Sequence, residues 1–408
     1  MRDKIRRYEL NTDEFYAYGH LYEPWAYVDT EIVLTEDIDG SKLSESVSMA
    51  FNRMPYYKVR IGVATKPERY ILESNLNEFK VVREDDFLSF TDSRSCDYLI
   101  TVAFFARTIR IRISHVLCDA YGMNLFISFI LCAYCGKDGK SYRPPELTDT
   151  NSILTSEYDN PFDYIVLPDE ICTIRNVRSF SFETGEISDT QVSLTRILIP
   201  GDQFLVFAKR NESSVSAVGA WIIMNTIQRV KGRLNMPISI AVPCDMRSIL
   251  GCKKNMRNCN IDLKLTMHMK MMDKGPDYQL SCLRSQLFAQ MYDPVALGRM
   301  ESSKEGWLRA VKLETIREKT AFYGADENLD EIPIVSYAGS LDIGEFNDKV
   351  EAFHQYVAIS GRAGILCGIT YHHGMFEFNI SSNLKEWDKY QAEMELFLEE
   401  KCITCQMK

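Results

Sequence analysis

A histidine, an aspartate and a glycine lie close together in residues 114–122, whose sequence is SHVLCDAYG. Imidazole titrates near neutral pH, so His115 is suited to act as a general base that takes a proton from a hydroxyl or an amine. Asp119 can hold the loop by accepting charge-assisted hydrogen bonds, and Gly122 permits a turn that a Cβ would forbid. The alternative interpretation is a structural histidine whose hydrogen bonds are satisfied on a tight strand-to-helix turn.

The elements around this segment would place His115 at the end of a strand. Two apolar-rich patterns predict strands over 98–106 and 108–114, and the apolar run from Met123 to Cys135 continues a helical pattern. The segment 114–122 is therefore expected to be the turn between a strand and a helix.

The rest of the chain predicts a mixture of strands and helices. Strands are expected at 30–34, 57–63, 69–73, 79–83, 190–199, 237–243, 333–337, 353–359, 364–371 and 374–381. Helices are expected at 39–54, 201–210, 214–231, 276–292, 305–320 and 385–402. The turn-rich, polar residues 136–189 are interpreted as a crossover with some structure of its own, because a structureless loop of this length is uncommon.

Composition excludes several classes of protein. The 408 residues carry a net charge of −10, which argues against an extended nucleic-acid interface. The longest apolar run, Leu125 to Cys135, is too short to span a bilayer, and no secretory signal follows Met1. The 12 cysteines are therefore expected to be reduced thiols of a cytoplasmic protein. The two Cys-x-x-Cys pairs, at 132/135 and 402/405, are too far apart for a zinc ribbon, so no metal site is expected.

The segment around His115 resembles the His-x-x-x-Asp motif of one acyltransferase superfamily. That superfamily contains chloramphenicol acetyltransferase, the BAHD plant acyltransferases and the condensation domains of peptide synthetases. Two departures are visible: Ser114 stands where many members have a first histidine, and Gly122 lies three residues after Asp119 instead of directly after it.

Three further segments carry the same resemblance, in the expected order. ISIAVPCDMR is similar to the family's Pro-x-Asp-x-Arg strand and ends at Arg247. RNCNIDLKL is similar to the Gly-Asn strand, with Arg257 for the glycine and Asn258 at the asparagine. IPIVSYAGSLDI is similar to the Ser-Asn-x-Gly strand, with Tyr337 in place of the asparagine.

The resemblance implies an α/β fold of two chloramphenicol-acetyltransferase-like lobes, each a two-layer α+β sandwich, with an active-site tunnel between them. We expect residues 1–185 to form the N-terminal lobe, which carries the motif and the crossover. Residues 186–408 would form the C-terminal lobe.

The resemblance also implies roles for individual residues. His115 would be the general base, while Asp119 would point away from it and pair with Arg247. Gly122 and Asn258 would have structural roles at the site.

Other residues have weaker assignments, each with an alternative. Ser336 is a candidate oxyanion donor, but a serine at a strand end is commonly only a solvated hydroxyl. We expect contacts with substrate or coenzyme A from Tyr337 and Gly339. Lys253, Lys254 and Arg257 could neutralise the phosphates of coenzyme A, unless they form a solvated basic loop.

These features together predict a stand-alone, monomeric acyltransferase of secondary metabolism without a permanently bound cofactor. An acyl group would pass directly from a thioester, with acyl-CoA as cosubstrate, to a hydroxyl or amine of a small-molecule acceptor in a ternary complex. One alternative is a condensation-type protein that uses the thioester of a carrier protein to form an amide. A second is a degenerate, non-catalytic binding protein.

The remaining histidines are not assigned to catalysis. His372 and His373 copy a double-histidine motif, but they are expected at the tip of a strand–turn–strand hairpin, where His373 and Glu377 would form a structural or surface pair. His20, His268 and His354 have no companion pattern.

Overall fold

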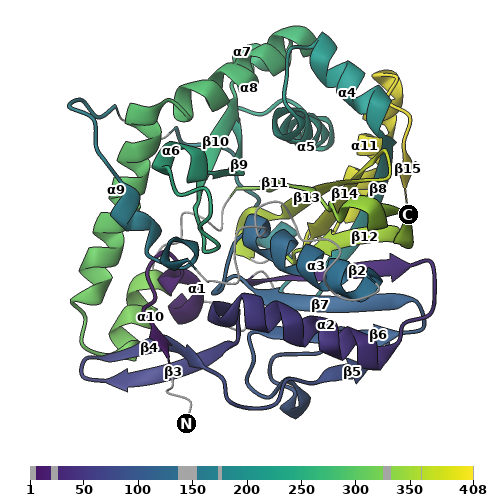
Figure 1. Ribbon diagram of the computed structural model, residues 1–408. Helices are drawn as coiled ribbons and strands as arrows, with labels where there is room; N and C mark the ends of the chain where they lie inside the picture. The colour runs from purple at the N-terminus through teal and green to yellow at the C-terminus, as the bar shows by residue number, and fades with distance from the viewer. Residues whose placement is uncertain are drawn as a thin grey trace.

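The chain forms two large sheets, each covered by helices, and a third, smaller sheet (Figure 1). The computed structural model describes residues 6–19, 26–136, 154–172, 177–324, 332–359 and 361–407 of the 408 residues. His20 and part of the expected crossover at 136–189 lie outside these described residues.

The N-terminal lobe contains a five-stranded sheet. Every second residue of β2 is buried, as expected for a strand with one face in the core. The strands in spatial order are β12 (Val350–Tyr356), β2 (Tyr27–Leu34), β7 (Thr108–Ser114), β6 (Ile100–Phe105) and β5 (Val81–Arg83). A smaller sheet has the order β1 (Arg7–Tyr8), β4 (Glu68–Ser74) and β3 (Val59–Thr65).

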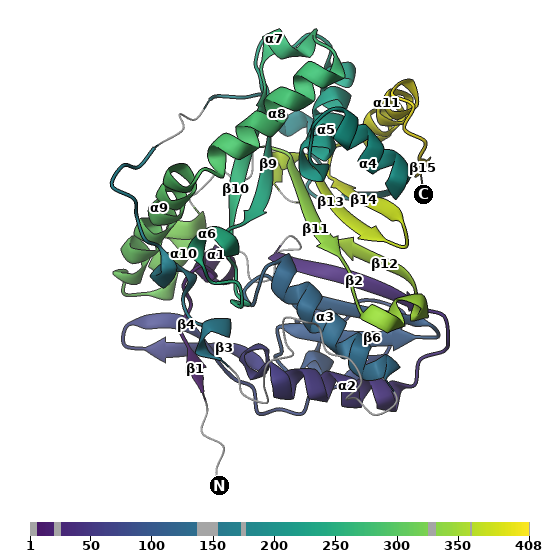
Figure 2. The ribbon, with the colours of Figure 1, turned by 45° about the horizontal axis from the view of Figure 1, so that its top comes forward.

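Two helices pack together in this lobe, α2 (Gly40–Arg53) and α3 (Ala120–Cys135). The Asp39 side chain caps α2 by accepting hydrogen bonds from the backbone N–H groups of Ser41 and Lys42. Apolar residues of the two helices join those of β2, β6 and β7 in one core. Figure 2 shows α3 running beneath β12 of its own lobe and β11 of the other lobe.

The C-terminal lobe contains a seven-stranded sheet. Its order is β10 (Asn260–Met267), β9 (Ile238–Asp245), β11 (Ile334–Ser340), β13 (Ile365–His372), β14 (Met375–Ser382), β8 (Ser193–Pro200) and β15 (Gln406–Met407). The helices on this sheet are α4 (Gly201–Arg210), α5 (Val215–Lys231), α8 (Pro276–Gln290) and α11 (Trp387–Glu400). The buried Trp221 of α5 lies at the centre of their shared core.

Shorter elements and connecting helices complete the fold. The remaining α-helices are α1 (Glu14–Gly19), α6 (Arg247–Leu250), α7 (Met269–Met272), α9 (Asp293–Val311) and α10 (Ile316–Gly324). Short 3-10 helices occur at Pro55–Tyr57, Ser93–Ser95, Thr155–Glu157, Pro161–Tyr164, Thr184–Glu186, Gly344–Lys349 and Gly361–Ala363. None of the helices in the described ranges is both long and apolar enough to cross a membrane.

One predicted helix is wrong. The expected helix at 305–320 is divided between α9 and α10, with a break at 312–315. In the break, the Glu318 side chain accepts hydrogen bonds from the backbone N–H groups of Glu314 and Thr315, and this starts α10 afresh. The short elements α1, α6 and α7 were not predicted.

Strand β12 joins the two lobes. It pairs with β2 along the edge of the N-terminal sheet, although it lies near the end of the chain, and it also packs against β13 and β14. The division of the chain into two lobes at residue 185 stays a prediction. The pairing of β12 with β2 shows that the N-terminal sheet includes a strand from the C-terminal part of the chain.

Candidate functional site

The turn after β7 is built by local hydrogen bonds that fix the backbone of His115. Its N–H donates to the carbonyl of Ala26 at 2.8 Å, and the N–H of Leu117 donates to the carbonyl of Ser114 at 3.0 Å. The Asp119 side chain then caps α3, because its Oδ1 accepts from the N–H of Gly122 at 3.4 Å. The histidine therefore lies between the end of a strand and a capped helix.

The imidazole of His115 is oriented by a backbone carbonyl. Its Nδ1 lies 3.2 Å from the carbonyl oxygen of Cys118. A carbonyl can only accept, so Nδ1 carries the proton of the neutral ring and Nε2 is left as an acceptor. Burial lowers the pKa of His115 below its usual 6.5, although the Cys118 carbonyl and the Asp119 charge oppose this shift. The ring is therefore neutral at pH 7, as a general base must be.

Tyr16 of α1 stacks on this imidazole. The two ring centroids are 5.0 Å apart and the rings are inclined by 18°. Burial, with the nearby carboxylates of Asp262, Asp119 and Asp13, raises the pKa of the Tyr16 hydroxyl. This contact was not predicted, because the aromatic-rich segment that contains Tyr16 has no clear periodicity.

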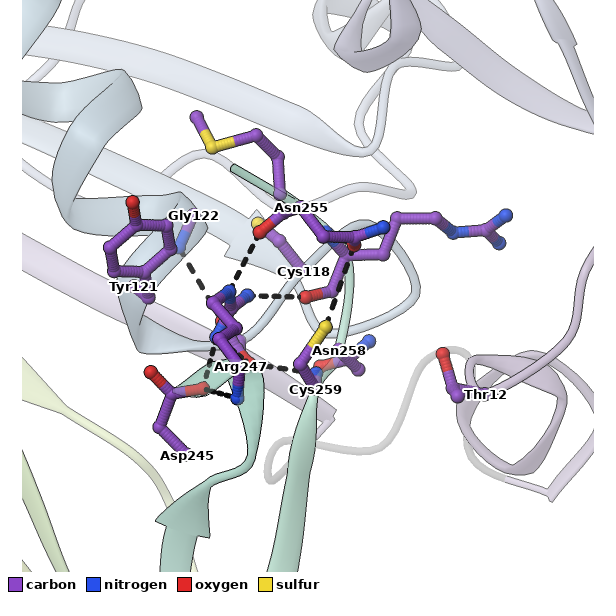
Figure 3. A network of polar contacts seen from close by, with 12 residues as sticks. Thr12, Cys118, Tyr121, Gly122, Asp245, Arg247, Asn255, Asn258 and Cys259 are labelled. Carbon is purple, nitrogen blue, oxygen red and sulfur yellow. Dashed lines mark hydrogen bonds and ion pairs between the residues drawn. The ribbon is translucent and has the colours of Figure 1, made fainter. Parts of the chain in front are cut away.

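Asp119 does not contact the imidazole; it forms a buried ion pair with Arg247 of the other lobe. Arg247 Nη1 and Nη2 each lie 2.9 Å from one oxygen of Asp119. The N–H of Cys259 also donates to Asp119, at 2.9 Å. Arg247 is held in turn by the carbonyls of Asn255 and Arg257 and by the carboxylate of Asp245 (Figure 3).

The ion pair between Asp119 and Arg247 is almost completely buried. Its side chains are only 3% and 7% exposed, so its charges have almost no access to water. The ring of Tyr121 covers the guanidinium of Arg247 at 4.3 Å. The ion pair therefore connects the turn after β7, in the N-terminal lobe, to α6 of the C-terminal lobe.

Gly122 is required by close packing. A Cβ at this position would lie 2.5 Å from both the carbonyl oxygen of Met256 and the hydroxyl of Tyr57. The glycine thus lets the first turn of α3 approach the 251–259 loop of the other lobe.

Asn258 supports the backbone of the histidine. Its Nδ2 donates to the carbonyl of His115 at 2.7 Å and to Asp13 at 2.5 Å. Asp13, from the turn before α1, also accepts from the guanidinium of Arg257. This network connects His115, the 251–259 loop and the start of α1, which carries Tyr16.

The structure contradicts the expected basic cluster. Arg257 is 6% exposed and is paired with Asp13, so it is not available to neutralise a phosphate. Lys253 and Lys254 are exposed. Sequence proximity was misleading because the loop becomes buried directly after Lys254, and residues 255–259 are all buried.

A cavity of about 650 Å³ opens beside His115, between the lobes. Ser336, Tyr337 and Gly339 of β11 line its wall. The register of β11 against β13 shifts between Tyr337 and Gly339, and Gly339 has a φ of 86°, which favours glycine. The bulge therefore changes the direction in which the side chains of β11 point along the cavity.

Asn124 of α3 fixes the position of this bulge. Its Nδ2 donates to the carbonyl of Ala338 at 2.8 Å, and its Oδ1 accepts from Gln355 of β12 at 2.8 Å. One amide thus connects α3, β11 and β12 at the cavity wall. No pattern in the sequence indicated this role of Asn124.

The double histidine lies where it was expected, in the β13–β14 hairpin. His373 and Gly374 have positive φ values of 46° and 73°, which are typical of a two-residue hairpin turn. Glu377 pairs not with His373 but with His354 of β12, whose Nδ1 lies 2.7 Å from Oε1. Strand pairing brings these two residues together, and no sequence spacing indicates it.

The cysteines offer no metal or disulfide chemistry. All twelve are described, and none forms a disulfide bond. Within the described residues, no group of three or more metal-ligating side chains is present.

No family model and no curated protein matches the sequence. Solved structures with the same fold nevertheless cover nearly the whole chain. F. sporotrichioides TRI101 complexed with coenzyme A and T-2 is 11% identical with a TM-score of 0.67, over 98% of this chain and 99% of that chain. The TRI3 trichothecene 15-O-acetyltransferase from Fusarium sporotrichioides is 11% identical with a TM-score of 0.60, over 97% and 94%. The epimerization domain from the third module of tyrocidine synthetase B is 10% identical with a TM-score of 0.60, over 97% of each chain. The two-lobed fold expected from the resemblance is thus confirmed.

Proposed function

We propose that this protein is an acyltransferase that moves an acyl group from a thioester to a hydroxyl or an amine, with His115 as the general base. The observation that carries the proposal is the neutral, oriented imidazole of His115 at the wall of a 650 Å³ cavity between the lobes. Among the described residues no hydrogen bond engages its Nε2. That nitrogen is therefore suited to accept a proton from a bound acceptor.

The reaction would proceed by direct attack. As Nε2 removes the acceptor's proton, the acceptor oxygen or nitrogen bonds to the thioester carbonyl carbon. The tetrahedral intermediate then collapses, the carbon–sulfur bond breaks, and the thiolate takes up the proton from His115. Holding both substrates in one cavity supplies much of the rate acceleration.

An oxyanion donor would face the carbonyl carbon. Ser336 lines the same cavity as His115 and has a hydroxyl that can donate, so we assign this role to it. Tyr337 and Gly339 line the cavity beside it and would contact substrate.

No covalent acyl-enzyme is required. Cys118 is the nearest thiol along the chain to His115, but it is fully buried, and burial raises the pKa of its thiol. A thiol that is neutral and shielded from substrate is a poor nucleophile.

Coenzyme A is the proposed thiol of the donor. This rests on the likeness to TRI101, which was solved in complex with coenzyme A. Since Arg257 is paired with Asp13, the phosphates would have to be bound elsewhere, and the exposed Lys253 and Lys254 remain candidates.

The test is a screen of purified protein with several acyl-CoAs and small acceptors, in which released thiol is measured. His115→Ala should lower the rate at least about a hundredfold, as expected for the loss of a general base. His268→Ala, at an exposed histidine, is the matched control and should change little. Activity of His115→Ala within a few fold of the parent would exclude His115 as the base.

A further inference from the structure

The cavity beside His115 carries more negative than positive side chains. Four carboxylates line it, and the one lining cation is Arg247, which is bound by two of these carboxylates. The four are Asp119, Asp245, Asp262 and Asp342. The thioester end of the acyl donor is uncharged, so it would gain no affinity from these carboxylates. We therefore relate the negative charge of the cavity to the acceptor.

Asp262 differs from the other three because no hydrogen bond to its carboxylate is found among the described residues, although the charge of Arg299 acts on it. It lies on β10, opposite Pro243 of β9, and both residues line the cavity. No described residue donates a hydrogen bond to its carboxylate; Arg299 donates to Gln290 and to the backbone carbonyl of Asp262 instead. Burial raises the pKa of Asp262, although the charge of Arg299 opposes this shift, so a further cation at the carboxylate would stabilise its ionised form.

Asp262 is also close to the catalytic centre. Its charge is the largest contribution from a neighbouring carboxylate to the raised pKa of the Tyr16 hydroxyl. Tyr16 stacks on the imidazole of His115, and all three residues line the same cavity, so one bound acceptor could face both Asp262 and the proposed base.

Resting on the proposed acyltransferase function, we propose that the acceptor carries an ammonium group and that Asp262 binds it. An ammonium–carboxylate contact is a charge-assisted hydrogen bond, which is about twice as strong as a neutral one. Phe15, Tyr16 and Tyr121 supply aromatic surface in the same wall, which favours a cation further.

The ammonium group must be distinct from the group that is acylated. A protonated amine has no lone pair and cannot attack a carbonyl carbon. The acceptor therefore has its ammonium at Asp262 and a separate hydroxyl or neutral amine at His115, as in an amino alcohol or a polyamine.

The experiment compares tyramine with tyrosol, two probes that differ only in an ammonium in place of a hydroxyl. Calorimetric titration of the full chain should give a dissociation constant at least about tenfold lower for tyramine. Asp262→Asn should abolish this difference, whereas Asp262→Glu, which keeps the charge, should retain it. Asp189→Asn, an exposed aspartate that does not line the cavity, is the matched control for the change in net charge.

Each outcome has one meaning. Equal affinities for the two probes, no tyramine binding at millimolar concentration, or a preference that survives in folded Asp262→Asn would overturn the inference. If Asp262→Asn fails to fold, the preference must still be present in Asp262→Glu and absent in Asp262→Ala. Binding does not depend on turnover, so a protein that prefers tyramine but releases no thiol from any acyl-CoA contradicts only the proposed function.

Discussion

Burial favours the neutral form of His115, and with His115 as the proposed base this would determine how the proposed activity depends on pH. The pKa of the imidazole lies below 6.5, so the base is already deprotonated at neutral pH. A general base must be unprotonated to act, and protonation on acidification removes it.

We therefore expect kcat/KM to be constant from about pH 7 upward and to fall tenfold per pH unit below the pKa of His115, with a midpoint under 6.5. The measurement is a pH–rate profile with a fixed acyl-CoA and an acceptor that does not itself titrate in this range. His268→Ala should leave the profile unchanged. A midpoint above 6.5 would contradict the effect of burial.

Asp119 has a structural role that substitution can separate from catalysis. Asp119→Ala removes both oxygens that hold the buried Arg247, and loss of one partner of a buried pair typically costs about 3–5 kcal/mol of unfolding free energy. Asp245→Ala removes the second carboxylate on the same guanidinium, but that side chain is 52% exposed and should cost about 0–1 kcal/mol.

Chemical denaturation of both variants measures the difference. An Asp119→Ala protein as stable as the parent, with only a loss of activity, would mean that Asp119 acts on the imidazole directly.

Among the individual residues, the motifs and the Asp119–Arg247 pair that the resemblance implies were predictable, but contacts outside those motifs were not. His115, Asp119 and Arg247 could be selected because the segments that carry them resemble known motifs. Tyr16 and Asn124 lie in segments without such a motif, and Asp262 lies in the segment RNCNIDLKL at a position to which the resemblance gave no role. They come to the cavity only through the packing of elements far apart in the chain.

Among the elements, the contact of α3 with β11 sets the geometry of the cavity wall. Asn124 is the amide that joins them, and the bulge of β11 carries Ser336 and Gly339. A shift of about 1 Å in a reacting group can cost about a hundredfold in rate.

We expect Asn124→Ala to lower kcat about 10–100-fold while the protein stays folded. Asn124→Asp loses the donor to Ala338 but keeps an acceptor for Gln355, so it should be intermediate. Asn225→Ala removes an amide that bonds within α5 and to Gln279, away from the cavity, and should leave kcat unchanged. An unchanged kcat for Asn124→Ala would show that the bulge keeps its position without the amide.

Elements with a strong local signal could be predicted from the sequence. Helix α5 begins where the Ser214 side chain caps it, and its mostly apolar residues 217–224 form a continuous buried run, as expected for a helix inside the core. The helix at 305–320 was misplaced because apolar residues continue across the break, while the Glu318 contacts that interrupt it depend on side-chain geometry. Helix α1 is short and is stabilised by packing on α10, a contact that no local pattern encodes.

For the whole molecule, β12 is one of the connections between the two lobes, beside the Asp119–Arg247 pair. Its backbone belongs to the N-terminal sheet, and His354 on it reaches Glu377 of the C-terminal sheet. Glu377 also accepts from Asn379 at 2.7 Å and lies 3.7 Å from Arg196.

Glu377→Ala should lower the unfolding free energy by about 1–3 kcal/mol, because it leaves these buried donors without an acceptor. Glu351→Ala is a control on the same strand: it removes an exposed pair with Arg107, worth about 0–1 kcal/mol. Denaturant titration followed by tryptophan fluorescence measures both. Equal losses for the two variants would mean that the buried pair does not hold β12 to the second lobe.

The late position of β12 in the sequence also affects how the protein folds while it is being synthesised. During synthesis at about 5–20 residues per second, the roughly 300 residues between β2 and β12 take about 15–60 seconds to appear. Throughout that interval the edge of β2 has no strand to pair with, and an unpaired edge is a template for association with other chains. Nascent chains of this protein should therefore be most prone to aggregate before residue 356 has left the ribosome, and most dependent on chaperones that shield β-strand edges.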